Sequence, residues 1–449
     1  MSDILIVGAG VTGLTLAWAL REQGHRVRLL EARPEAGGNI RSLHADQYLV
    51  DLGPNSLLDR GGEGLARLVD ELGLEQRVVV ANPAASRRYV CRDGRVQALP
   101  AGPGGFMRTP LFSLRAKFRL LGEPWRGRAG QDESVADFVR RRLGPEFLDW
   151  AVDPFVSGVY AGDAEKLSVR AATARIYALE AEAGSLIRGA VRRARQGRAA
   201  GPTPRGRLIG FRDGLHELTD ALAAQLDGEL FTGTPVNGLR RLAGKWVADT
   251  AQGPEEAERL VLAVPAHAAA DLLEPFKREL AGDLRGISYP GVVNVALGFP
   301  RQAVAHALDG FGLLIPSREG CETLGVLFSS TLFPGRAPAE HVLLTAFVGG
   351  ARNPDAPARD DASLIAGVVK ELTPLLGLSG APDFARVTRW PRAIPQYNLG
   401  HLERLGRIDT ALDELPGLTL AGNWRGGIAV GDCINNALAL ADQLGDSGE

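Results

Sequence analysis

Near its start the chain reads Asp3-Ile-Leu-Ile-Val-Gly-Ala-Gly-Val-Thr-Gly13. The short apolar run from Ile4 to Val7 predicts a buried parallel strand. Three glycines follow at G-x-G-x-x-G spacing. Gly8 permits a tight turn, Gly10 lets a pyrophosphate approach the backbone, and Gly13 lets a helix pack closely on the strand. The stretch therefore predicts a Rossmann-like dinucleotide-binding unit.

The residues after these glycines complete the pattern. Leu14 to Gln23 predicts a helix, whose first turn presents unpaired N–H groups and a positive dipole end to phosphates. A second strand, Arg26 to Leu30, ends at Glu31, eighteen residues after Gly13. A carboxylate at this distance accepts hydrogen bonds from a ribose 2′-OH. We therefore expect a bound dinucleotide cofactor.

The overall composition narrows the class of protein. At 449 residues the chain is too long for one ordinary domain, so we expect two domains or one interleaved pair. A net charge of −2 argues against a general nucleic-acid binder. Only three distant cysteines occur, so we expect no disulfide framework, no metal site and a reducing compartment. The run from Ile4 to Val7 is too short for a secretory signal, and no stretch of about 18 apolar residues could span a membrane. We expect a cytoplasmic protein.

Two short segments predict turns beside a ligand. The Gly53-Pro54 pair would bring the Asn55 and Ser56 backbone close to a bound group, although an ordinary strand-ending turn has the same pattern. Further on, the Asp93-Gly94 dipeptide predicts a hairpin over residues 87–96. The arginines of this hairpin are either solvated, or one of them points into a pocket and pairs with a substrate carboxylate.

Residues 101–130 combine apolar and basic side chains. Leu114, Phe118 and Leu121 fall on one helical face with basic residues around them. Such a segment can lie on an anionic membrane surface, or it can be an ordinary surface helix. The local pattern leaves both interpretations open.

The middle of the chain predicts helices and then strands. A helix begins after Ser134, a candidate N-cap, and more follow to about residue 197. We expect a break between Pro154 and Asp163 that could place backbone in a cavity, and a solvated loop from Arg188 to Arg207. A mixed sheet along one wall of a substrate chamber is expected from the strands Val292–Leu297, Leu324–Phe328, Val342–Phe347 and Ala385–Arg389.

The last element repeats the logic of the first. Leu418 to Ala421 predicts an apolar strand that ends in glycines, and Cys433 to Leu444 predicts a helix whose N-terminus can face the cofactor. A further buried strand, Arg259 to Val264, leads back to the same unit. Both ends of the chain are therefore expected to converge on one ligand.

Together these segments resemble the protoporphyrinogen and coproporphyrinogen oxidase family of amine-oxidase-type flavoproteins, along nearly the entire chain. The resemblance is carried by Asp51-Leu-Gly-Pro-Asn55, Arg87-Arg88-Tyr89, Ser157-Gly-Val-Tyr-Ala-Gly162, Leu167-Ser-Val-Arg170, Gly310-Phe-Gly-Leu-Leu314, Phe347-Val-Gly-Gly350, Ile394-Pro-Gln-Tyr-Asn-Leu-Gly-His401 and Gly427-Ile-Ala-Val-Gly-Asp-Cys433. The segment ending at His401 and the one ending at Cys433 are much more specific than the glycine fingerprint.

The resemblance implies an α/β fold with an α+β substrate domain, three domains being interleaved in one chain. A Rossmann-like FAD-binding domain would comprise residues 1–85, 205–275 and 400–449. A mixed-sheet substrate-binding domain would comprise residues 86–100 and 276–399. A helical, membrane-facing domain would comprise residues 101–204, which favours peripheral membrane binding through residues 106–121.

The resemblance also implies FAD as a tight, non-covalent cofactor. Members of the amine-oxidase-type group carry a second glycine element, which Gly37-Gly38 matches, usually with Arg two residues before it; here Glu35 stands there and Arg33 lies further upstream. The implied cofactor-binding residues are Gly8, Ala9, Gly10, Val11, Thr12, Gly13, Glu31, Ala32, Gly37, Gly38, Asn39, Gly53, Pro54, Asn55, Ser56, Val236, Asn423, Ile428, Ala429 and Val430.

The implied reaction is the six-electron oxidation of protoporphyrinogen IX to protoporphyrin IX in haem biosynthesis, with O₂ or another electron acceptor. Because the flavin accepts the hydride, the protein has mainly to orient a macrocycle and exclude water. By resemblance Arg88 pairs with a propionate, Leu314 and Phe347 sandwich the pyrrole rings, and the Gly158 backbone lines the bottom of the cavity. No residue stands out as a general base, and we interpret His401 and Cys433 as structural.

Several alternatives remain open at this point. Coproporphyrinogen III could be the substrate by the same mechanism, since it carries two propionates in place of two vinyl groups and needs extra cationic partners. A flavin amine oxidase would need a lysine near the flavin, and lysine is scarce in this chain. A non-catalytic FAD-binding protein would keep the fold without turnover. Both a monomer and a homodimer fit the sequence.

Overall fold

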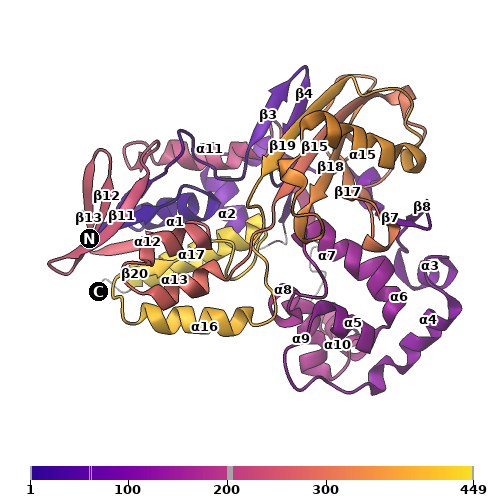
Figure 1. The fold of residues 1–449 in the computed structure, drawn as a ribbon, viewed down its shortest axis with the longest axis horizontal. Coiled ribbons are helices and arrows are strands. Elements are labelled where there is room, and N and C mark those ends of the chain that lie inside the picture. Colours follow the sequence, from indigo (N-terminus) through magenta and orange to yellow (C-terminus); the bar gives the residue numbers. More distant parts are fainter. Residues whose placement is uncertain (1–2, 60, 62, 200–205, 447–449) are drawn as a thin grey trace.

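A computed structural model describes residues 3–59, 61, 63–199 and 206–446 (Figure 1). Its first part is a five-stranded sheet whose neighbouring strands are all parallel, as the N-terminal motif predicts. In spatial order the strands are β10 (Leu230–Phe231), β2 (Arg26–Leu30), β1 (Asp3–Val7), β14 (Arg259–Leu262) and β20 (Leu418–Leu420). Strands from both ends of the chain therefore lie in one sheet, as expected.

This sheet is buried on both faces. Successive side chains of a strand point to opposite faces, so Ile4 and Ile6 enter one hydrophobic core while Leu5 and Val7 enter the other. This explains why the strand is apolar without alternation. The first core is closed by α1 (Val11–Glu22), α2 (Glu63–Glu71), α11 (His216–Gln225) and α17 (Val430–Asp446). The second is closed by α12 (Ala266–Leu273), α13 (Arg278–Arg285), α16 (His401–Leu412) and the sheet of β11 (Val236–Leu242), β12 (Lys245–Thr250) and β13 (Gly253–Ala257).

A second, seven-stranded sheet lies at the upper right of Figure 1. Its order is β19 (Phe384–Trp390), β15 (Val292–Pro300), β18 (His341–Gly349), β17 (Thr323–Phe328), β16 (Gly312–Leu314), β7 (Tyr89–Arg92) and β8 (Arg95–Ala98). All pairs are antiparallel except β16 with β7, so the predicted mixed sheet is confirmed. The helix α15 (Asp361–Leu376) packs its apolar side chains into the core on one face. The predicted Asp93-Gly94 turn joins β7 to β8, and both its residues have positive φ.

Smaller elements connect the two sheets. A hairpin is formed by β3 (Ser42–Ala45) and β4 (Tyr48–Asp51). A three-stranded sheet joins β5 (Leu57–Asp59), β9 (Arg207–Phe211) and β6 (Val78–Val80), and α14 (Ser329–Leu332) lies between β17 and β18 in the chain. The Gly53–Ser56 segment lies between β4 and β5 in the chain.

Helices fill the lower right of Figure 1. They are α3 (Gly102–Arg108), α4 (Leu114–Arg119), α5 (Val135–Arg142), α6 (Pro145–Phe147), α7 (Asp153–Tyr160), α8 (Val169–Ala172), α9 (Ala174–Ala183) and α10 (Leu186–Ala199), with the short 3₁₀ helix η3 (Leu120–Trp125) and the π-helical turn η4 (Leu148–Val152). The Ser134 side chain caps α5 by accepting the Asp137 N–H at 3.0 Å, as expected. Among the described residues, none of these helices or any other is long and apolar enough to cross a membrane.

Two expectations about this region are wrong. The break expected between Pro154 and Asp163 is instead the helix α7, because Pro154 stands in its first turn, where a missing N–H costs nothing. The loop expected from Arg188 to Arg207 is helical as far as Ala199, because arginine and alanine are good helix formers even without an apolar face. The part of that loop at 200–205 lies outside the described residues.

Candidate functional site

The glycine turn after β1 has the geometry that its sequence predicts. Gly8 has φ +102°, and a Cβ on it would lie 2.7 Å from the Ala263 carbonyl oxygen. A Cβ on Gly13 would lie 1.9 Å from the Gly8 oxygen, so helix and strand pack too closely for any side chain there. A Cβ on Gly10 would meet no protein atom within 4 Å and would enter the adjoining cavity. Of these three glycines, Gly10 is therefore the one where a side chain would point into the cavity rather than into protein atoms.

Glu31 is buried at the end of β2, beside this turn. Its Oε2 accepts the Ala9 N–H at 2.8 Å and its Oε1 accepts the Arg33 N–H at 2.9 Å. The carboxylate is thus fixed in orientation while it still lines the cavity. Ala9 does not itself line the cavity; its N–H orients Glu31.

The second glycine element packs directly on the first. Gly37 and Gly38 have φ +100° and +61°, and the Gly37 N–H donates to the Ala9 carbonyl at 2.8 Å. A Cβ on Gly38 would lie 3.1 Å from the Gly10 Cα. Arg33 donates to the Gly38 carbonyl at 3.1 Å and lines the cavity, whereas Glu35 is exposed and does not. A guanidinium therefore stands at this element although the sequence position of the arginine differs from the family pattern.

The loop after β4 faces the same cavity. Gly53 is pressed against Asn39, since a Cβ on it would lie 1.9 Å from the Asn39 carbonyl oxygen. The Asn55 side chain donates to the Gly53 carbonyl at 2.8 Å and closes the turn. All four residues from Gly53 to Ser56 line the cavity, as the turn signal predicts.

Tyr397 fixes the C-terminal segment of the site. Its buried hydroxyl donates to the Asn423 carbonyl at 2.7 Å and accepts the Gly427 N–H at 3.0 Å. This holds the glycine-rich connection after β20, and Ile428, Ala429 and Val430 then line the cavity where α17 begins. Burial raises the pKa of Tyr397 well above its ordinary value, so the hydroxyl keeps its proton for this role.

His401 and Cys433 stand near this segment as neutral groups. The His401 ring stacks on Tyr397 with centroids 4.3 Å apart, and burial lowers its pKa to about 4. Burial raises the pKa of the Cys433 thiol to about 11. Near neutral pH the His401 ring is therefore neutral and only weakly basic, and the Cys433 thiol keeps its proton, in keeping with the structural interpretation of both.

These segments enclose one large cavity of about 1100 Å³. The cavity exceeds the range of roughly 300–1,000 Å³ that is usual for small-molecule sites. Of the cofactor-binding residues predicted from the sequence, all line it except Ala9 and Gly13, which support the turn from behind. A fixed carboxylate, a glycine turn opening a helix and a second helix N-terminus are the groups that a dinucleotide needs. The residues present therefore fit FAD.

The other half of the cavity is mostly apolar and lies against the second sheet. It is lined by Ser157, Gly158, Val159, Ala161, Val292, Asn294, Phe311, Leu324, Leu327, Phe347, Trp390, Ala393 and Ile394. Two of the four predicted substrate residues, Gly158 and Phe347, are among them. Leu314 does not line the cavity but packs against Gly158 of α7, since its Cδ2 would be 2.6 Å from a Cβ on Gly158.

The two neighbouring arginines of the hairpin have different surroundings. Arg87, whose side chain is largely exposed, pairs with the half-buried Asp309. The Arg88 guanidinium lies 5.4 Å from the centre of the Phe311 ring, which lines the cavity. Among the described residues Arg88 has no ion-pair partner, although it is exposed and does not line the cavity itself. The Arg88 guanidinium thus lies near a ring of the cavity lining, whereas Arg87 is paired with Asp309.

Comparison with known proteins decides the family. Residues 11–444 match the profile of the flavin containing amine oxidoreductases. The chain belongs to this family. It is a flavin-dependent oxidoreductase, and FAD is its cofactor.

Relatives within the family include proteins named for two porphyrinogens. The chain is 34% identical to the chloroplastic protoporphyrinogen oxidase of Nicotiana tabacum, over 98% of this chain and 85% of that protein. It is 30% identical to the coproporphyrinogen III oxidase of Bacillus subtilis (strain 168), over 99% of each chain. A crystal structure from Exiguobacterium sp. 255-15, assigned to protoporphyrinogen oxidase, superposes with a TM-score of 0.85 at 25% identity over 99% of both chains. The chain therefore falls within the porphyrinogen-oxidising branch that its motifs resemble.

Some site residues were not expected from the sequence. Arg33 lines the cavity from a position outside the family pattern, and Tyr397 was noted only as part of a motif, without a role. The signal for Tyr397 is its place in the Ile394–His401 motif, which is more specific to the family than the glycine fingerprint and so suggests a contact near the cofactor. Asp51 belongs to one of the motifs that carry the resemblance, but nothing in the sequence pairs it with Arg336.

Proposed function

We propose that this enzyme oxidises protoporphyrinogen IX to protoporphyrin IX, with O₂ as electron acceptor and H₂O₂ as the second product. One observation carries the proposal: a single cavity is lined both by the buried Glu31 and by the apolar residues around Phe347. The protoporphyrinogen oxidase and coproporphyrinogen oxidase relatives support the substrate class. The apolar half suits the flat tetrapyrrole face, because burying apolar surface is favourable but not directional.

When bound, FAD supplies a two-electron hydride acceptor. The chain's own part is to bind, orient and exclude water. In this proposal Phe347 packs against the rings, and the Gly158 backbone of α7, supported from behind by Leu314, lies against them. Arg88 pairs with one propionate. Apolar contacts alone would let the macrocycle rotate in its plane. The directional ion pair between Arg88 and one propionate therefore determines which bridge carbon faces the flavin.

The charges of the cavity favour protoporphyrinogen over coproporphyrinogen. Coproporphyrinogen III carries two additional propionates, and burying a carboxylate without a cationic partner is costly. Of the lining residues that the structure describes, Arg33 is the one cation, and it stands at the Glu31 end. The apolar half therefore suits vinyl groups better than carboxylates.

The same lining weighs against a flavin amine oxidase. That group places a lysine near the flavin, and the lining within the described part of the chain contains no lysine.

Aerobic turnover tests the proposal: it should yield fluorescent porphyrin with three H₂O₂ per porphyrin. Bound FAD without any porphyrin formation would instead favour a non-catalytic FAD-binding protein.

We propose the three-part domain division with one change. The parallel-sheet region would comprise residues 1–85, 205–275 and 400–449, and residues 276–287 would join it. Leu280, Ala281 and Leu284 of α13 support this change because they pack in its second core. Residues 86–100 and 288–399 would form the substrate-binding domain, and residues 101–204 the helical domain.

We also propose that the helical domain binds a membrane surface peripherally. The supporting observation is exposure: Leu114, Phe118, Leu121 and Trp125 are 66%, 66%, 68% and 78% exposed. Lys117, one of the basic residues of this segment, is instead buried, and its Nζ donates to the Met107 and Thr109 carbonyls. Membrane contact therefore rests on the apolar side chains and on the exposed arginines around them.

Flotation with anionic vesicles tests the membrane proposal. Changing Phe118 and Trp125 together to Glu should abolish flotation, and high salt should weaken it. Leu242→Glu is a control, since Leu242 is also exposed, at 58%, but is the last residue of β11, outside the helical domain. Flotation that survives the double change would show that these residues form an ordinary surface.

A further inference from the structure

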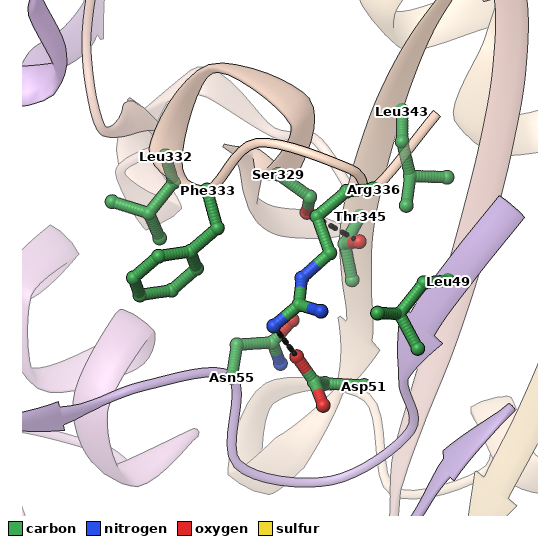
Figure 2. Close-up of a pocket in the computed structure, with 9 residues that line it drawn as sticks. All are labelled: Leu49, Asp51, Asn55, Ser329, Leu332, Phe333, Arg336, Leu343 and Thr345. Atoms are coloured by element: carbon green, nitrogen blue, oxygen red, sulfur yellow. Dashed lines mark hydrogen bonds and ion pairs between the residues drawn. The ribbon is translucent and has the colours of Figure 1, made fainter. Parts of the chain in front are cut away.

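A buried ion pair lies just behind the cofactor cavity. The Arg336 guanidinium meets Asp51 with Nη2 3.1 Å from Oδ2, and their side chains are 2% and 3% exposed (Figure 2). Asp51 is the last residue of β4, and the next residues in the chain, Leu52 to Ser56, all line the large cavity. Arg336 comes from the other part of the structure, between α14 and β18, and does not line that cavity.

The pair ties several segments together at one point. Asp51 Oδ1 accepts the Leu215 N–H at 2.8 Å and the Ser42 hydroxyl at 2.6 Å. Arg336 Nη2 also donates to the Phe211 carbonyl at 3.3 Å, and the guanidinium lies 5.5 Å from the Phe333 ring centre. The planar guanidinium can lie against an aromatic ring while its N–H groups meet a carboxylate and a carbonyl, whereas the ammonium of lysine is a point charge on a flexible stem.

Two more side chains from the second sheet hold the same segment. The Asn294 amide donates to the Asp51 and Leu52 carbonyls at 3.3 and 3.2 Å, and the Trp390 indole N–H donates to the Leu52 carbonyl at 2.8 Å. The start of the cofactor-facing loop is therefore fixed from the substrate sheet rather than from the dinucleotide domain alone.

The second nitrogen of the guanidinium has space beside it. Arg336 Nη1 is buried and has no hydrogen-bond partner among the described residues. A small cavity of about 10 Å³ adjoins it, lined by the polar side chains of Asn55, Ser329 and Thr345, and Figure 2 shows the guanidinium pointing between Asp51 and Asn55. This volume is about that of a single water sphere, and a water there would have polar partners on several sides.

We propose that Arg336 is a positioning residue for FAD, which fixes the Gly53–Ser56 segment through Asp51. The reason is the cost of losing the guanidinium. The Asp51 carboxylate would keep one N–H and one O–H donor but would be buried without a counter-charge. The segment would then shift so that the carboxylate reaches solvent. The loop that follows it in the chain then loses its fixed distance from the Gly8–Gly13 turn. The inference requires FAD binding but not porphyrinogen oxidation, so it stands or falls separately from the proposed substrate.

The test compares two buried arginines by two measurements. Arg336→Lys and Arg336→Met are prepared beside Arg142→Lys, because Arg142 is equally buried in an ion pair with Glu180 and does not line the cavity. Thermal unfolding of each apoprotein reports stability, and quenching of flavin fluorescence on binding reports the Kd of FAD. We expect both kinds of variant to unfold at lower temperature, but only the Arg336 variants to bind FAD more weakly, by roughly tenfold or more.

The result that overturns the proposal is specific. If a folded Arg336 variant binds FAD as tightly as the unchanged protein, or if Arg142→Lys weakens FAD binding equally, the pair acts on stability alone. Should Arg336→Met fail to fold, Arg336→Lys supplies the measurement, because it keeps a charge that supports folding but replaces the planar guanidinium beside the Phe333 ring with a flexible ammonium. Asp51→Asn offers a further check, since it should weaken FAD binding in the same way as the arginine changes.

Discussion

Replacing Arg88 and Arg87 one at a time separates a substrate contact from a surface ion pair. Arg87 pairs with Asp309 while its side chain is 63% exposed, and ion pairs so open to solvent contribute little. Arg88 lies beside Phe311 of the cavity lining and has no ion-pair partner among the described residues. A hydrogen bond from a guanidinium to a propionate contributes about 1.5–3 kcal/mol, and the exposure of Arg88 favours the lower end. Arg88→Ala should therefore weaken substrate binding by roughly tenfold.

The assay is steady-state porphyrin formation with FAD content measured on the same samples. Arg88→Ala should raise KM and also lower kcat, because a substrate that is not held at one corner presents the wrong bridge carbon to the flavin. FAD content should stay unchanged, and Arg87→Ala should have little effect on either constant. A damaging Arg87→Ala beside a silent Arg88→Ala would refute the reasoning, and it would mean that the side chains of this strand face the opposite way.

Further predictions concern the cofactor and pH. Gly10→Val should give a folded protein without FAD, because the valine side chain would enter only the cavity. Gly13→Val should not fold, since a Cβ there would lie 1.9 Å from the Gly8 oxygen. The yellow colour of bound flavin and thermal unfolding distinguish the two variants. Acid precipitation should release the flavin into the supernatant, and colour that stays with the pellet would contradict non-covalent binding. Burial lowers the pKa of His401 from 6.5 to about 4, so on acidification the unfolded chain takes up the proton before the folded one does. The free energy of unfolding should therefore be unaffected by this group above pH 6.5 and should fall as the pH drops towards 4, by up to about 3 kcal/mol. His401→Phe should flatten the melting temperature across that range, and an unchanged slope would show that other groups cause it.

The sequence predicts the parts of the structure that depend on local pattern. The glycine turn, Glu31 and the Gly53–Ser56 loop were expected and do line one cavity, apart from the supporting residues Ala9 and Gly13. The exposed face of Leu114, Phe118 and Leu121 was also expected from helical spacing. In each case the signal lies within a few residues, where backbone sterics and periodicity act directly.

Features that depend on tertiary packing were not predictable. Lys117 looks like one more solvated cation in the sequence, yet two backbone carbonyls nearby satisfy its ammonium in a buried position. Pro154 looks like a helix breaker, yet it stands in the first turn of α7. Asp51 and Arg336 lie far apart in the chain, and only the packing of the β3–β4 hairpin against the connection between α14 and β18 brings them together.

Anaerobic reduction of the bound flavin tests the central claim most directly. The holoenzyme is mixed with either porphyrinogen without oxygen, and the loss of flavin absorbance is followed in time. We predict rapid bleaching by protoporphyrinogen IX, much slower bleaching by coproporphyrinogen III, and return of the flavin colour when O₂ is added. Faster bleaching by coproporphyrinogen III would contradict the charge argument from the apolar cavity, and no bleaching by either compound would contradict porphyrinogen oxidation altogether.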